Sequence, residues 1–167
     1  MSIDALSALA RSLVAPGKGI LAADESTKTI TKRFAEARVP STPDQRRAYR
    51  ELLVSAPAID AAISGVILVD ETIRQNTQDG TPFPRVLDQR GIIPGIKVDA
   101  GTSPLPGFPD ETITGGLDGL ADRLAEYRVL GARFAKWRAV IAVGGDRPTA
   151  GCIAANAHAL ARYAALC

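Results

Sequence analysis

Apolar and polar positions follow two patterns along this chain, a helical spacing in some segments and short continuous apolar runs in others. The first segment has helical spacing and predicts an amphipathic helix that ends at Pro16 and Gly17. Its apolar positions are Ile3, Leu6, Leu9, Ala10 and Leu13.

The continuous apolar runs predict buried strands, because side chains of a strand covered on both faces are nearly all apolar. These runs occupy residues 19–24, 65–71, 92–99 and 132–143. Helices are expected between and after them, at residues 42–53, 117–130 and 150–167, with a loop and short helix over residues 26–38. Strands that alternate with helices favour an α/β fold with a parallel sheet, either doubly wound or closed into a barrel.

One helix start is marked by three neighbouring residues. Thr42 is a preferred N-cap, Pro43 suits the first helical position, and Gln45 can complete a capping box. The helix is therefore expected to begin at residue 43.

Composition is that of an ordinary globular domain, with 46% hydrophobic and 23% charged residues among 167. The net charge is +2, and the fifteen arginines are scattered, which argues against a nucleic-acid partner. Two cysteines and a single histidine, His158, are too few for a zinc site or a disulfide framework. No secretory signal or membrane span is visible, so a cytoplasmic location and a reducing compartment are expected.

Charged residues stand inside or directly after each apolar run. They are Asp24 and Glu25, Asp70 and Glu71, Lys97 and Asp99, and Lys136 and Arg138. A charge in a buried strand is costly unless it is paired, and for any one position a structural ion pair at the rim explains it about as well as function. For the whole set, function is favoured: in a parallel barrel the carboxyl ends of the strands line the active site, and such charges suit a phosphorylated substrate.

Two other residues favour structural roles. His158 has no partner in sequence and is expected to face solvent or to be satisfied locally. Trp137 lies between Lys136 and Arg138, so strand alternation places it on the opposite face, where we expect it to pack against a helix.

Five segments, in order and spacing, resemble the class I fructose-1,6-bisphosphate aldolase family. They are GKGILAADES, GVILVDET, GIKVD, GLDGL and FAKWRAV, and the resemblance extends from about Leu9 to Cys167. It implies the N-terminal half of a (β/α)8 TIM barrel, with four parallel strands and their helices. It also implies a glycolytic lyase that cleaves fructose 1,6-bisphosphate reversibly into dihydroxyacetone phosphate and glyceraldehyde 3-phosphate through a lysine Schiff base, with no metal and no cofactor.

The resemblance also implies a role for particular residues. Asp24 would handle protons near the reacting carbonyl, and Lys136 would assist formation and dehydration of the carbinolamine. A second group would bind substrate or phosphate: Ser26, Thr29, Arg33, Lys97 and Arg138.

This chain departs from the family pattern at two positions and in length. Lys28 stands where the family usually has Gly, and Asp70 where it often has His or Gln. The family's VPIVEPE and LKPN motifs, the latter with the Schiff-base lysine, are absent from these 167 residues. We therefore expect a single partial domain over residues 1–167, half of a family barrel, that is inactive in isolation.

Three hypotheses remain open from the sequence. The leading one is the N-terminal half of such an aldolase, which binds sugar phosphates and forms a homo-oligomer through its open sheet edges. The second is a non-catalytic half-barrel that binds sugar phosphates or partner proteins. The third is a homodimeric barrel in which Lys136 or Lys97 has become the Schiff-base amine.

Overall fold

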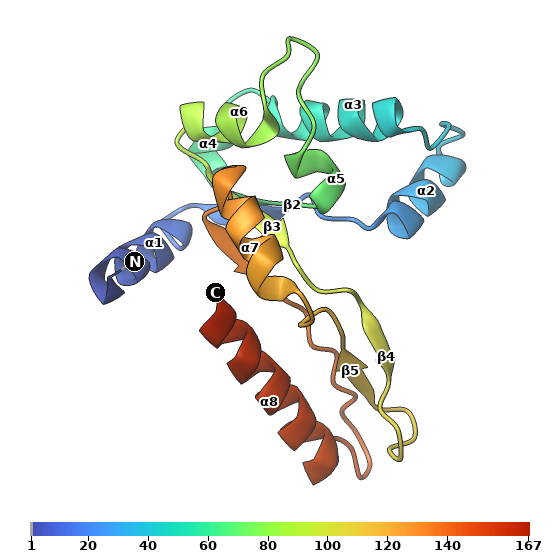
Figure 1. The fold of residues 1–167 in the computed structure, drawn as a ribbon. Coiled ribbons are helices and arrows are strands. Elements are labelled where there is room, and N and C mark those ends of the chain that lie inside the picture. Colours follow the sequence, from blue (N-terminus) through green and yellow to red (C-terminus); the bar gives the residue numbers. More distant parts are fainter. Residues whose placement is uncertain (1) are drawn as a thin grey trace. The chain divides into compact units, whose positions relative to one another are not determined.

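The computed structural model describes residues 2–167, which form two compact units (Figure 1). The first unit holds the described residues up to Lys97 together with Tyr127–Phe134. The second holds Val98–Glu126 and Ala135–Cys167. The domain boundaries expected from the sequence stay a prediction.

Four predicted strands are present in one sheet. They are β1 (Gly19–Ala22), β2 (Ile63–Leu68), β3 (Ile93–Lys97) and β6 (Phe134–Lys136), in the order β1-β2-β3-β6. The β1–β2 and β2–β3 pairs are parallel. The α/β class with parallel strands and helices is thus confirmed.

Other side chains pack closely against the sheet at two glycines, Gly65 and Gly95. An ideal Cβ on Gly95 would lie 2.2 Å from the Cζ atom of Phe134, and one on Gly65 would lie 2.8 Å from Leu13 Cδ2. Real Cβ atoms essentially never lie so close to another heavy atom, so the missing side chain leaves room for the Phe134 ring at Gly95 and for the Leu13 side chain at Gly65. Around them, Val66, Leu68 and Ile96 are buried in the core.

Helices of the first unit include three that the sequence predicts and three short ones that it does not. The predicted ones are α1 (Ile3–Leu13), α2 (Thr27–Glu36) and α3 (Pro43–Val54), and the short ones are α4 (Ile59–Ala62), α5 (Asp70–Ile73) and α6 (Phe83–Gln89). α3 begins as expected, since the Thr42 hydroxyl accepts a hydrogen bond from the Gln45 amide.

All four strands end before the apolar runs that predict them. β2 ends at Leu68, and Asp70 begins α5, so Asp70 and Glu71 belong to a helix and do not close the strand. β3 ends at Lys97, two residues before Asp99. Asp99 therefore lies outside the strand that its apolar run predicts.

The fourth predicted strand is the largest difference, because residues 137–143 are not strand. Two backbone carbonyls of this segment accept hydrogen bonds from threonine hydroxyls instead of from a neighbouring strand. The Thr114 hydroxyl donates to the Arg138 carbonyl and the Thr112 hydroxyl to the Val140 carbonyl, each at 2.7 Å. These bonds replace a strand ladder, and Arg138 lies beyond the strand that was expected to place it on the same face as Lys136.

The second unit contains a hairpin that the sequence analysis missed. Its strands are β4 (Thr102–Pro104) and β5 (Thr112–Thr114), which pair antiparallel. The two predicted helices are α7 (Leu120–Val129), which crosses from one unit to the other, and α8 (Ala150–Leu166). In Figure 1 the hairpin runs beside α8, and the Asn156 amide group donates to the Thr112 carbonyl at 3.1 Å.

Among residues 2–167, no helix combines the length and apolar character needed to cross a bilayer.

Candidate functional site

Three of the predicted site residues lie in the loop after β1 and in the first turn of α2. Asp24 follows β1 and is buried, with 9% of its surface exposed. Ser26 is the N-cap of α2, and its hydroxyl oxygen accepts from the Thr29 amide at 3.3 Å and lies 3.0 Å from the Thr29 hydroxyl. A carboxylate and a pair of hydroxyls therefore lie together at the start of α2.

Glu25, between Asp24 and Ser26, is where three side chains meet. Arg33 Nη1 donates to Glu25 Oε1 at 2.5 Å, and the Tyr49 hydroxyl donates to the same oxygen at 3.2 Å. Arg50 Nη1 forms an ion pair with Glu25 Oε2 at 2.8 Å. The structure thus pairs Arg33, predicted to bind phosphate, with Glu25, and this contact holds Arg33 beside the loop.

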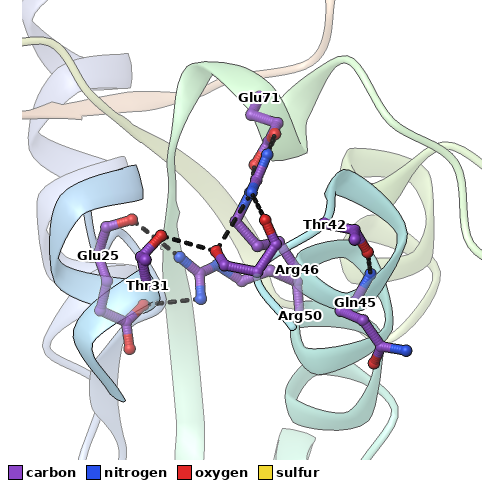
Figure 2. Close-up of polar contacts among 8 residues, drawn as sticks. Glu25, Thr31, Thr42, Gln45, Arg46, Arg50 and Glu71 are labelled. Carbon is purple, nitrogen blue, oxygen red and sulfur yellow. Dashed lines mark hydrogen bonds and ion pairs between the residues drawn. The ribbon is translucent and has the colours of Figure 1, made fainter. Parts of the chain in front are cut away.

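Arg50 extends from α3 toward this loop and is almost completely buried, with 2% of its surface exposed (Figure 2). Its Nη2 atom also donates to the Glu25 backbone carbonyl at 3.0 Å. Burial lowers the pKa of the Arg50 guanidinium, and the negative charges of Glu25 and Asp24 oppose that effect. Arg50 therefore interacts with both acidic residues that follow β1.

Arg46 lies one turn before Arg50 on α3 and binds Glu71 (Figure 2). Its Nε and Nη2 atoms donate to the two carboxylate oxygens at 2.8 and 2.5 Å, and Nη1 donates to the Ser41 carbonyl at 2.8 Å. This bidentate pair raises the pKa of Arg46 and lowers the pKa of Glu71. α3 thus contacts the segments that follow both β1 and β2.

Lys97 is the last residue of β3 and is half-buried. Because β1, β2 and β3 are parallel, their carboxyl ends lie at one edge of the sheet. Asp24, Glu71 and Lys97 each lie at or just beyond one of these ends. These three charged residues therefore lie at the same edge of the sheet.

The other two predicted site residues belong to the second unit. Lys136 ends β6 and is half-buried, and its carbonyl accepts from the Val98 amide at 3.1 Å. Arg138 is exposed. Between them, the Trp137 ring stacks on Tyr163 of α8 with ring centroids 5.3 Å apart, which confirms the prediction that Trp137 packs against a helix. His158 is exposed on α8, as expected.

The α3 arginines, Arg46 and Arg50, are not among the site residues predicted from the sequence. A signal was present, since Arg46, Arg50 and Val54 are spaced four residues apart and so share one face of the helix. Val54 is fully buried, which shows that this face points inward. Elsewhere on the first unit, an open hollow of about 240 Å³ lies between α3, α6 and the turn at 77–81, and it contains none of the predicted site residues.

Comparison with known proteins identifies the family. The family model described as fructose-bisphosphate aldolase class-I matches residues 5–167. A relative named probable fructose-bisphosphate aldolase class 1, from Xanthomonas campestris pv. campestris, is 62% identical over the whole chain, which covers 50% of that relative. The fructose-bisphosphate aldolase of Drosophila melanogaster is 53% identical over 98% of the chain, which covers 46% of it.

A solved structure agrees with these relatives. Fructose-bisphosphate aldolase from Plasmodium falciparum superimposes with a TM-score of 0.94 at 46% identity, over 98% of this chain and 48% of that one. The chain thus spans about half the length of the proteins it matches. Since the family model covers all but its first four residues, this chain belongs to the class I fructose-bisphosphate aldolase family.

Proposed function

We propose that this chain provides part of the active site for the reversible aldol cleavage of fructose 1,6-bisphosphate into dihydroxyacetone phosphate and glyceraldehyde 3-phosphate, a step of glycolysis. Family membership supports the reaction class. The observation that carries the proposal is the grouping of Asp24, Ser26, Thr29 and Lys97 at the carboxyl edge of the first unit's parallel strands.

The start of α2 suits a phosphate group. The N-terminus of a helix presents unpaired amides and a partial positive charge, both of which favour an anion. The hydroxyls of Ser26 and Thr29, which hydrogen bond to each other, add polar groups there. Arg33 on α2 and Lys97 at the end of β3 supply positive charge at this edge of the sheet. We assign these four residues to the phosphate of the aldehyde half of the substrate.

We assign proton transfer to Asp24 and Lys136, and substrate binding to Arg138. Asp24 is a buried carboxylate directly after β1, and a positioned carboxylate can accept or return a proton at a reacting carbonyl. Lys136 and Arg138 lie in the FAKWR segment, whose family counterpart gives them carbinolamine chemistry and substrate binding. Neither role requires a metal or a cofactor, and we assign none.

We further propose self-association and a cytoplasmic location. β1 is an edge strand of the described sheet, and its Ile20 is 42% exposed, so this edge can pair with another copy. The cytosolic aldolase of Arabidopsis thaliana, 53% identical over 98% of this chain, supports the compartment.

A binding titration tests the phosphate assignment. Calorimetry with inorganic phosphate and with glyceraldehyde 3-phosphate should show binding to the 167-residue chain, weakened about tenfold or more in Lys97→Ala through loss of a charge-assisted contact. Lys18→Ala removes an exposed lysine before β1 and should leave the affinity unchanged. Equal affinities for all three proteins, or no binding to the parent, would contradict the assignment.

A further inference from the structure

α3 contacts the segments that follow two strands through two arginines one turn apart. Arg46 binds Glu71, after β2, and Arg50 binds Glu25, after β1 (Figure 2). Glu25 lies between Asp24, assigned to proton transfer, and Ser26, assigned to phosphate binding. The helix therefore contacts the loop that carries the proposed chemistry.

Arg50 holds Glu25 at two points. Nη1 contacts the carboxylate at 2.8 Å, and Nη2 donates to the backbone carbonyl at 3.0 Å. The carbonyl belongs to the peptide bond between Glu25 and Ser26, so one rigid guanidinium restrains both that peptide bond and the Glu25 side chain. Asp24 and Ser26 are the residues on either side of the restrained Glu25.

This arrangement is unfavourable for stability alone. Arg50 is 2% exposed, and neither its Nε nor its Nη1 atom has a hydrogen-bond partner among the described residues, so the contact between Nη1 and the Glu25 carboxylate is an ion pair only. Well-packed apolar side chains commonly replace buried ion pairs with no loss of stability, whereas removal of one partner is strongly destabilising. A buried arginine at this position therefore needs an explanation other than packing.

We propose that Arg50 is a positioning residue, whose two-point contact with Glu25 orients the Asp24 carboxylate and the Ser26 cap of α2. The inference rests on the proposed function for what those groups do, but the orientation can be measured without it. Arg46 offers a matched comparison, since it lies on the same face of the same helix and binds a different glutamate.

The main experiment uses NMR on the 167-residue chain. The carboxyl ¹³C shift of Asp24 reports its surroundings, and the exchange rates of the Thr29 and Ile30 amides report the two hydrogen bonds that they donate to Ser26. The variants are Arg50→Lys, which keeps the charge but loses the two-point contact, and Arg46→Lys. Val54→Ala is the control for general destabilisation of α3, because it removes buried apolar atoms and leaves the contacts with Glu25 and Glu71 in place.

In Arg50→Lys we expect the Asp24 carboxyl signal to move and exchange at Thr29 and Ile30 to accelerate about tenfold more than global destabilisation accounts for. Arg46→Lys should instead accelerate exchange of the Ile73 amide, in the α5 segment that carries Glu71. Val54→Ala should accelerate exchange only as much as it lowers global stability. An Asp24 signal that stays in place in Arg50→Lys, or moves equally in all three variants, would overturn the proposal.

Glu25→Gln provides a second route to the same contact. It preserves size and the backbone carbonyl but removes the charge that pairs with Arg50, and it should move the Asp24 signal in the way that Arg50→Lys does. No movement in Glu25→Gln would also overturn the proposal. Phosphate titration of the same samples separates the two ideas: a parent chain that binds no phosphate contradicts the proposed function, while the Asp24 signal still decides the role of Arg50.

Discussion

The Glu111 carboxylate accepts two hydrogen bonds from Thr149, one from its amide at 2.8 Å and one from its hydroxyl at 2.5 Å. Glu111 is 1% exposed and directly precedes β5, whereas Thr149 is the N-cap of α8. The Thr149 hydroxyl oxygen also accepts from the Cys152 amide at 3.1 Å. One carboxylate thus links the hairpin to the capped end of the last helix.

This link should make the second unit sensitive to acid. Burial raises the pKa of Glu111, but the hydrogen bonds from Thr149, together with smaller effects of Cys152 and the Arg147 charge, outweigh it and leave the pKa below its usual value. The stabilisation is therefore present above the unfolded glutamate pKa of about 4.3 and is lost as the pH falls through the lower folded value. Urea unfolding from pH 7 to pH 3, followed by fluorescence of Trp137 beside α8, should show this loss in the parent and not in Glu111→Gln.

Asp110→Asn is the control for that measurement, because Asp110 is exposed and pairs with Arg147 at the surface. It should leave the acid dependence in place, since exposed ion pairs add little stability. If Glu111→Gln and the parent lose stability in parallel on acidification, the hairpin link is not the acid-sensitive element.

The contact between Gly95 and Phe134 predicts a packing defect. A methyl group on Gly95 would meet the ring at 2.2 Å, so Gly95→Ala should lower the free energy of unfolding by about 1–3 kcal/mol. Chemical denaturation measures the loss. Gly19→Ala is the matched control, because nothing lies within 4 Å of its added Cβ, and adding Phe134→Leu to Gly95→Ala should recover part of the loss.

The Arg46–Glu71 pair should contribute a measurable coupling energy. Both side chains are partly exposed, so we expect about 1 kcal/mol from a double-mutant cycle of Arg46→Gln and Glu71→Gln at pH 7. Because Arg46 lowers the pKa of Glu71, the coupling should be present above pH 4.3 or so and vanish as acid protonates Glu71. A coupling energy unchanged down to pH 3 would show that the pair does not titrate as proposed.

Borohydride trapping tests the assignment of the lysines. When borohydride is added with dihydroxyacetone phosphate, we expect no reduced adduct on Lys97 or Lys136 in a polypeptide of residues 1–167. The family resemblance gives these lysines phosphate-binding and proton-transfer roles and places the Schiff-base amine in an LKPN motif, which these residues do not contain. Mass spectrometry that finds a stoichiometric adduct on either lysine would instead support the homodimeric barrel.

Local patterns in the sequence were sufficient for several features. Continuous apolar runs located the strands of the parallel sheet, and Thr42 with Pro43 marked the start of α3. The five linked segments were specific enough to identify the family, which the comparison confirmed. Each of these signals lies within a short stretch of chain, where side-chain periodicity and capping chemistry act directly.

Only the tertiary structure decided where the charges find partners. Glu25 and Arg50 are 25 residues apart in sequence, and nothing in their spacing selects that pair over any other. The ends of the strands were decided in the same way, since hydroxyls of β5 satisfy the backbone carbonyls after β6 and so end a run that is apolar for several residues more. Such contacts depend on which distant segments the folded chain brings together. A pattern within one short segment carries no information about a partner in another segment.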